Sequence, residues 1–213
     1  MRIGVLISGN GSNLQSLIDA RASGSLSAEI SIVISNVPDA IGLDRATKAN
    51  IPISIINHTD FKSREKFESA LHAALLDASV DFVCLAGFMR LLTEPFVNKW
   101  TNRIVNIHPS MLPAFKGLNT HERVLQAGVR FTGCTIHFVR PEMDEGPIIL
   151  QAAVPVLPGD GVDSLAARVL EQEHIIYPLA VEMIARDRVK VENGRVLIKE
   201  AGTQNASIIN PSS

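Results

Sequence analysis

The sequence predicts an α/β fold, a Rossmann-like twisted and mostly parallel sheet with helices on both faces, extended by an antiparallel hairpin in the C-terminal half. Short apolar runs alternate with segments of helical periodicity over the first hundred residues. Continuous apolar runs are typical of strands covered on both faces, and the alternation is typical of parallel sheets. Two later apolar runs follow each other with only residues 140–147 between them, which predicts an antiparallel pair.

The first half carries the predicted parallel strands and the helices between them. The strands are expected at 3–7, 30–34, 52–56, 80–85 and 103–107. The first helix is predicted by Leu14, Leu17 and Ile18, which recur at helical spacing. Two further helices are expected at 43–49 and 64–78. This order of elements places helices on both faces of one sheet.

The second half predicts strands at 132–139 and 148–156, then a long helix from Val162. Pro178 lies inside that helix and removes one hydrogen bond, so a kink or a split is expected there. A small hairpin is predicted around Asn193-Gly194, and residues 201–213 read as a loose polar tail. We expect one domain spanning 1–213, with a seam between its halves.

Composition excludes several classes of function. A chain of 213 residues can bury roughly 70% of its unfolded surface, so it needs no disulfide or metal to hold a core. The net charge is −2 and the pI is about 6.3, which argues against a nucleic-acid partner. Cys84 and Cys134 lie in apolar runs and are expected to be reduced and buried. The apolar run at 2–7 is too short for a signal peptide and no run approaches the ~20 residues of a membrane span, so a cytoplasmic location and no membrane partner are expected.

The loop Ser8-Gly-Asn-Gly-Ser-Asn13 joins the first strand to the first helix. Its glycines allow a sharp turn and a close approach of the backbone, and Ser12 or Asn13 is expected to cap the helix. Free N–H groups at a helix start suit a phosphate. The loop lacks the third glycine of a dinucleotide fingerprint and the lysine of a Walker loop, so a phosphate monoester fits better than NAD or ATP. An ordinary strand-to-helix turn is the alternative.

Asn106 and His108 lie two residues apart on a predicted strand that ends at Pro109. Both side chains therefore point to the same face, at the end of the strand where open α/β sheets bind ligands. Histidine exchanges a proton near neutral pH, and asparagine can donate to an oxygen that gains negative charge. Asp144 is a candidate to orient His108 and to favour its imidazolium form, although spacing alone does not place it there. A surface histidine beside a turn-forming asparagine is the alternative.

The other histidines carry weaker signals. His137 is expected either to point toward the seam or to be structural, and His121 lies at a predicted helix start. His58 and His72 read as surface residues, and His174 has no assigned role. No pair of histidines or cysteines has convincing zinc-ligand spacing, so no metal is expected.

Five stretches of the sequence resemble one known family. They are Ser8-Gly-Asn-Gly-Ser-Asn-Leu14, Leu85-Ala-Gly-Phe-Met-Arg90, Asn106-Ile-His-Pro-Ser-Met-Leu-Pro113, Asp144-Glu-Gly-Pro147 and Gln172-Glu-His-Ile-Ile-Tyr-Pro178. On these motifs, about residues 1–190 resemble the phosphoribosylglycinamide formyltransferase (glycinamide ribonucleotide transformylase) family of the folate-dependent formyltransferases. The resemblance implies a cytoplasmic one-carbon transferase of de novo purine biosynthesis. Its co-substrate would be 10-formyltetrahydrofolate, with no metal.

The resemblance also implies roles for residues at matching positions. Asn106, His108 and Asp144 match the catalytic residues, and the ribonucleotide would be bound by Gly11, Ser12, Asn13 and Glu173. The folate would be bound by Arg64, Met89, Arg90, Leu91, Leu92, Asn106, Arg140, Pro141, Glu142, Met143 and Asp144. On this basis 1–100 is the phosphate-binding half of the domain and 101–200 the catalytic and folate-binding half.

Three alternatives remain at this point. A formyltetrahydrofolate deformylase would be expected to carry an additional N-terminal domain, and a methionyl-tRNA formyltransferase a basic C-terminal one. A non-catalytic nucleotide-binding module could use the same phosphate loop. The expected partners are the two small-molecule substrates, and the chain is expected to be a monomer or a homodimer.

Overall fold

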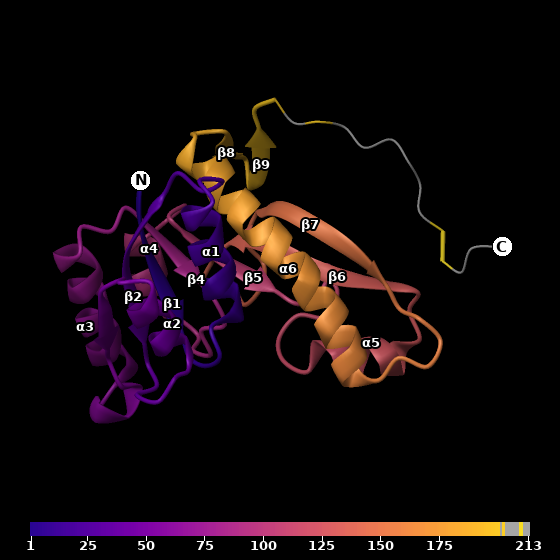
Figure 1. Ribbon diagram of the computed structural model, residues 1–213, viewed down its shortest axis with the longest axis horizontal. Helices are drawn as coiled ribbons and strands as arrows, with labels where there is room; N and C mark the ends of the chain where they lie inside the picture. The colour runs from indigo at the N-terminus through magenta and orange to yellow at the C-terminus, as the bar shows by residue number, and fades with distance from the viewer. Residues whose placement is uncertain (201, 203–208, 211–213) are drawn as a thin grey trace.

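A seven-stranded sheet forms the centre of the computed structural model, which describes residues 1–200, 202 and 209–210 (Figure 1). The strand order is β3-β2-β1-β4-β5-β6-β7. The strands are β1 (Arg2–Ile7), β2 (Glu29–Ser35), β3 (Ile53–Ile55), β4 (Phe82–Leu85), β5 (Ile104–His108), β6 (Phe131–Phe138) and β7 (Ile148–Pro155). The pairs from β3 to β5 are parallel, and β6 and β7 extend the sheet with antiparallel pairing. The predicted fold class is confirmed.

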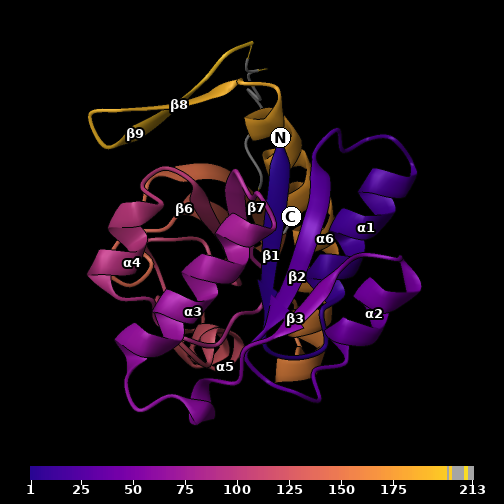
Figure 2. The same ribbon diagram turned by 90° about the vertical axis from the view of Figure 1, so that its left-hand side faces the viewer.

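Helices cover both faces of the sheet, as Figure 2 shows. On one face, α1 (Ser12–Ala22), α2 (Gly42–Lys48) and α6 (Val162–Ala185) bury their apolar side chains against β1, β5 and β6. On the other face, α3 (Arg64–Asp77) and α4 (Glu94–Lys99) pack on β2 and β4. The short helix α5 (Thr120–Ala127) packs beside α6. Because the strands are buried on both faces, their sequences are continuously apolar rather than alternating.

The hairpin of β8 (Val189–Glu192) and β9 (Arg195–Ile198) projects from the end of α6, as predicted. Asn193 and Gly194 both adopt positive φ, the conformation that a tight two-residue hairpin turn requires. The expected loose tail falls mostly outside the described residues. In the part of the chain that the structure describes, no helix is long and apolar enough to cross a membrane.

Three expectations of the sequence are corrected. The helix α6 is continuous through Pro178, so the expected split does not occur; Tyr177, next to the proline, is buried and its Oη donates a 2.8 Å hydrogen bond to the carbonyl oxygen of Leu85. The short helix α4 was not predicted; Phe96 and Val97 hold it in the core beneath α3. His58 and His72 are half-buried and hydrogen-bonded rather than surface residues.

Candidate active site

An apolar cavity that contains the predicted catalytic residues opens beside the C-terminal ends of β4 and β5. Its volume is about 570 Å³, within the range of small-molecule sites. The predicted site residues that line it are Met89, Arg90, Leu91, Leu92, Asn106, His108, Arg140, Pro141, Met143 and Asp144. Arg64 lies exposed at the start of α3, and neither Arg64 nor Glu142 is among the lining residues. The structure therefore brings most of the predicted set together around one space.

Asn106 and His108 lie on β5 and face this cavity together. The alternation of side chains along a strand predicts this, and the structure confirms it. On the neighbouring strand β6, the cross-strand partners of these two residues are His137 and Thr135. His108 is buried, so its ring is held by protein groups rather than by bulk water.

Asp144 reaches the same cavity from the connection between β6 and β7. Its Oδ2 lies 3.5 Å from His108 Nδ1 and accepts a 2.9 Å hydrogen bond from the backbone N–H of Gly117. The side chain is 11% exposed. The pairing of Asp144 with His108, which spacing along the sequence could not establish, is present in the structure.

A close approach of the backbone makes this placement possible. Gly146, two residues after Asp144, lies against β6 so tightly that a Cβ atom there would come within 1.5 Å of the Phe138 carbonyl oxygen. Any other residue would push the connection away from the strand. Glycine in the Asp-Glu-Gly-Pro stretch is thus required for the position of the Asp144 carboxylate.

Both ring nitrogens of His108 face acceptors. Nε2 donates a 3.0 Å hydrogen bond to the Phe115 carbonyl oxygen, and Nδ1 points to the Asp144 carboxylate. A neutral imidazole has only one N–H, so it can donate to one of these acceptors and not to both. The Phe115 carbonyl oxygen and the Asp144 carboxylate together hold the ring in one orientation at the cavity wall.

His137 is a further residue of the site that the sequence left undecided. Its Nδ1 donates a 3.0 Å hydrogen bond to the Phe138 carbonyl oxygen, so in the neutral ring Nε2 is free to accept. Asn106 Nδ2 lies 3.3 Å from that Nε2, and Asp144 Oδ1 lies 3.8 Å from it. Burial lowers the pKa of His137, which keeps the ring neutral and able to accept from Asn106. The register of β6 against β5 decides this contact.

His121 is the second histidine that sequence reasoning missed. It lies in the first turn of α5 and lines the cavity. Its pKa is lowered by burial and by the nearby charge of His108. The position of α5 over the cavity depends on the loop before it, so no local pattern would have identified His121.

The loop after β1 forms a second part of the site. Gly11, not Ser12 or Asn13 as expected, is the N-cap of α1, and its φ of 71° is left-handed. A Cβ atom at Gly11 would also lie 2.7 Å from the Cα of Gly42 at the start of α2. The loop therefore packs directly on a second helix and leaves the first N–H groups of α1 without side-chain caps. An anion can bind to such groups.

Asn13 is used for a different contact. Its Nδ2 donates a 2.7 Å hydrogen bond to Glu173 Oε2 of α6, and both residues are buried. Burial raises the pKa of Glu173, because no cation compensates the carboxylate there and only the amide of Asn13 opposes the shift. A buried carboxylate next to the phosphate loop is suited to binding polar groups such as hydroxyls.

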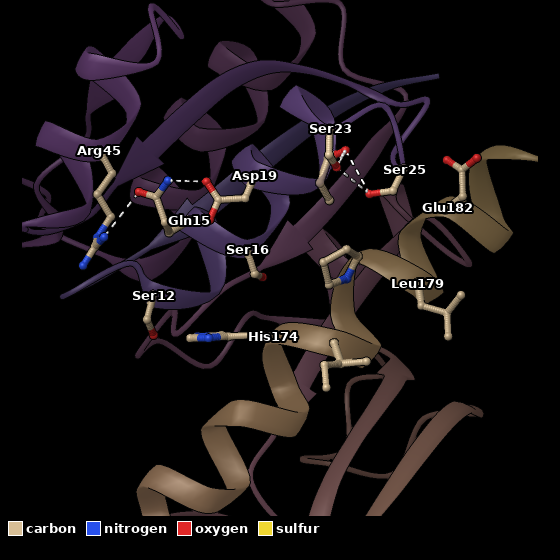
Figure 3. Close-up of a pocket in the computed structure, with 13 residues that line it drawn as sticks. Ser12, Gln15, Ser16, Asp19, Ser23, Ser25, Arg45, His174, Leu179 and Glu182 are labelled. Atoms are coloured by element: carbon tan, nitrogen blue, oxygen red, sulfur yellow. Dashed lines mark hydrogen bonds between the residues drawn. The ribbon is translucent and has the colours of Figure 1, made fainter.

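A groove of about 680 Å³ between α1 and α6 adjoins this loop (Figure 3). Arg45, from α2, donates to the carbonyl oxygen and side chain of Asn10 and so braces the loop. His174 extends from α6 toward Ser12 in this groove. Among the described residues, His174 Nε2 has no hydrogen-bond partner. Arg45 and His174 therefore line the groove with Ser12, and burial and the charge of Arg45 lower the pKa of His174.

The two cysteines are buried and are not activated as nucleophiles. Burial raises the pKa of Cys84 and of Cys134 to about 12, so neither is a thiolate at neutral pH. No cluster of three or more histidine, cysteine or acidic side chains that could hold a metal ion occurs within the described part of the chain.

Known proteins share this sequence and fold. The formyl transferase family model matches residues 1–181. The trifunctional purine biosynthetic protein adenosine-3 of Bos taurus is 54% identical over 92% of this chain, and the chain spans only 19% of that protein. The phosphoribosylglycinamide formyltransferase of Escherichia coli (strain K12) is 46% identical over 90% of each chain. The crystal structure of glycinamide ribonucleotide transformylase 1 from Symbiobacterium toebii superposes with a TM-score of 0.91, at 48% identity over 93% of both chains. The chain therefore belongs to the formyl transferase family, and within it to the phosphoribosylglycinamide formyltransferases.

Proposed function

We propose that the protein transfers the formyl group of 10-formyltetrahydrofolate to the amine of glycinamide ribonucleotide, a step of de novo purine biosynthesis. The observation that carries the proposal is the meeting of Asn106, His108 and Asp144 at the wall of an apolar cavity. The phosphate loop lies next to that cavity, since Ser8 at the start of the loop accepts a 2.8 Å hydrogen bond from the N–H of Met89 in the cavity wall. One site can therefore hold both substrates.

The ribonucleotide end of the proposed site is the loop at Gly11, Ser12 and Asn13. The backbone N–H groups and the positive end of the α1 dipole would bind the phosphate, with His174 and Arg45 nearby. Glu173 would accept hydrogen bonds from the sugar or the glycinamide, because its carboxylate lies beside Asn13 in the same place.

The folate end of the proposed site is the 570 Å³ cavity. Met89, Leu91 and Leu92 provide apolar cover, and backbone groups of the same loop are available to the edge of a planar heterocycle. Arg64 lies outside the cavity, where it would meet the glutamate end of a long ligand rather than its ring. The apolar walls and the polar groups at one end fit a formyl folate.

The proposed chemistry is direct transfer. The substrate amine attacks the formyl carbon, and a tetrahedral intermediate forms with negative charge on the former carbonyl oxygen. Asn106 would donate to this oxygen, and the positive charge of His108 would stabilise it. The amine nitrogen then loses a proton, folate N10 gains one and leaves, and the C–N10 bond breaks. His108, paired with Asp144 and helped by a bound water, would manage this proton exchange.

Two substrates held at once also contribute to the rate. Holding the amine and the formyl carbon together removes the entropic cost of a bimolecular encounter. Catalysis by the proposed route therefore needs both subsites to be filled.

The first test is formyl transfer by the purified protein. We expect 10-formyltetrahydrofolate to be converted to tetrahydrofolate only when glycinamide ribonucleotide is present, with one formylated ribonucleotide formed per folate consumed. Absorbance of the folate and mass spectrometry of the ribonucleotide measure the two products. Folate turnover without ribonucleotide would indicate a deformylase instead, and binding without turnover would indicate a nucleotide-binding module.

A second test addresses Glu173. We expect Glu173→Gln to raise KM for the ribonucleotide roughly tenfold or more, because a charge-assisted hydrogen bond is lost. KM for the folate should change little. The same variant should be more stable than the native protein at neutral pH. Burial raises the pKa of Glu173 in the folded state, so ionisation opposes folding increasingly as pH rises above the unfolded pKa. Glutamine does not ionise, so it removes this pH-dependent destabilisation, and its amide oxygen can still accept the hydrogen bond from Asn13 Nδ2.

Steady-state kinetics and thermal unfolding at pH 4 and pH 8 measure the two effects. The stability gain should be present at pH 8 and shrink at pH 4, where the native carboxyl is also protonated in both states. An unchanged KM for the ribonucleotide would remove Glu173 from the proposed site.

A further inference from the structure

A chain of hydrogen bonds runs along the C-terminal edge of the sheet, in the order of the strands β3, β2, β1 and β4. His58 follows β3, Asn36 follows β2, Ser8 follows β1 and Met89 follows β4. His58 Nδ1 lies 3.0 Å from the Asn36 carbonyl oxygen and 3.1 Å from Asn36 Nδ2, and Ser8 Oγ donates a 2.6 Å hydrogen bond to Asn36 Oδ1. The N–H of Met89 donates to Ser8 Oγ over 2.8 Å. The chain links the ends of four adjacent strands.

The direction of each bond around Ser8 is determined. A backbone N–H can only donate, so Ser8 Oγ accepts from Met89 and gives its single proton to Asn36 Oδ1. Asn36 is only 2% exposed, so bulk water cannot replace the Ser8 hydroxyl as the partner of its amide oxygen. Removing the Ser8 hydroxyl would leave both the Met89 N–H and Asn36 Oδ1 without their partner.

Ser8 stands between the two proposed subsites. It directly precedes the phosphate loop, and its own N–H donates to the Gly87 carbonyl oxygen over 3.2 Å. The stretch from Gly87 to Met89 is therefore attached to Ser8 through both its main chain and its side chain. Gly87 and Met89 both line the cavity, in the same stretch of wall as Phe88, Arg90, Leu91 and Leu92.

The other end of that wall has a separate anchor. The buried carboxylate of Glu68, on α3, accepts a 2.7 Å hydrogen bond from the N–H of Thr93 and another from its hydroxyl. Glu68 has no contact of this kind with the phosphate loop. The cavity wall is thus held at two ends: the hydrogen bonds at Met89 join it to Ser8 and the phosphate loop, and those at Thr93 join it to α3.

We propose that Ser8 is a positioning residue that couples the two substrate sites, so that a ribonucleotide phosphate on the loop after Ser8 tightens folate binding at the wall that contains Met89. A phosphate on this loop orders the residues that follow Ser8. The Ser8 hydroxyl transmits this ordering to the cavity wall. Folate binding then no longer bears the entropic cost of ordering the wall. Coupling of this kind is reciprocal, and folate equally tightens ribonucleotide binding. The inference rests on the proposed function for the identity of the two ligands.

The experiment measures tetrahydrofolate binding by calorimetry, with and without saturating glycinamide ribonucleotide. In the native protein the ribonucleotide should lower the Kd for tetrahydrofolate. In Ser8→Ala the ratio of the two Kd values should fall by roughly threefold to tenfold toward 1, the size expected for one hydrogen bond. A native ratio of 1, or an undiminished ratio in Ser8→Ala, overturns the coupling.

Two control variants separate coupling from general damage. Ser31→Ala removes a buried hydroxyl on β2 that accepts from Arg2 Nε, at the opposite end of the sheet, and should leave the ratio unchanged. Glu68→Gln loosens the wall at Thr93, so it should weaken tetrahydrofolate binding in both conditions and keep the ratio. A fall of the ratio in Ser31→Ala equal to that in Ser8→Ala would also contradict the proposal.

The outcomes remain informative if Ser8→Ala does not fold. Ser8→Cys keeps the shape of the side chain and offers a weak acceptor, so it should fold and still reduce the ratio. An undiminished ratio in Ser8→Cys would then overturn the coupling. Failure of the proposed function is distinct, because it would show as a native protein that performs no formyl transfer, whereas a native protein that transfers formyl with a Kd ratio of 1 refutes only the coupling.

Discussion

Replacing His108 by alanine is expected to lower kcat for formyl transfer by roughly 10²–10⁴-fold at saturating substrates, the usual contribution of a group that carries a proton and stabilises a developing charge. In the structure His108 faces the cavity, with its Nε2 bonded to Phe115 and its Nδ1 beside Asp144. Alanine removes the positive charge that would stabilise the oxyanion, while the walls at Met89 and the phosphate loop remain. KM for each substrate should therefore change much less than kcat.

The matched control is His72→Ala. His72 is half-buried and accepts a hydrogen bond from Trp100 Nε1, but it lies on α3 and does not line the cavity. Its loss should reduce thermal stability without affecting kcat. Stopped-flow measurement of a single turnover reports on the chemical step directly. A His108→Ala protein with a native single-turnover rate would remove His108 from the catalytic group.

Asp144→Asn is expected to have the second largest effect, a fall in kcat of roughly 10²–10³-fold. At about 1.4 kcal/mol per tenfold in rate, this fall corresponds to a loss of roughly 3–4 kcal/mol of transition-state stabilisation. Asparagine keeps an oxygen that can accept from the Gly117 N–H, so the connection between β6 and β7 should hold its position. The variant therefore tests the negative charge beside His108 Nδ1 and not the shape of the loop.

Asp160→Asn is the matched control for this variant. Asp160 lies just before α6 and forms an ion pair over 2.8 Å with Arg168, which lies within α6. Neither residue lines the cavity. Hydrogen bonds from Arg168 hold the pKa of Asp160 well below its usual range. The pair therefore stabilises the fold above the unfolded pKa, and this stability is lost as pH falls through the folded pKa. At pH 7, Asp160→Asn should unfold at a lower temperature with unchanged kcat. Equal losses of kcat in both variants would mean that the Asp144 effect is structural.

The positions of the parallel strands and of Asn106 and His108 follow from local chemistry. A strand buried on both faces must be continuously apolar, so each continuous apolar run of the sequence predicts a strand. The side-chain period of a strand is two, so residues 106 and 108 had to share a face once β5 was recognised. The cap of α1 could not follow from local pattern, because Gly11 takes a left-handed φ where it packs against Gly42, and this contact is tertiary.

The contacts among His108, Asp144 and His137 could not follow from local pattern. Asp144 lies 36 residues beyond His108 in the numbering, and the distance between them depends on how the connection after β6 folds back over β5. That return is possible because Gly146 allows the backbone to lie against Phe138. His137 was undecided for the same kind of reason, since only the antiparallel register puts it opposite Asn106.

The sequence by itself therefore determined the α/β class, the strand positions, the buried cysteines and the shared face of Asn106 and His108, because each depends on residues close together in the chain. The tertiary structure alone decided the pairing of Asp144 with His108, the contact of His137 with Asn106, and the continuity of α6 through Pro178. It also placed Ser8 between the phosphate loop and the cavity wall. These features join segments far apart in the sequence, and their energies come from burial and register that form only when the sheet is assembled.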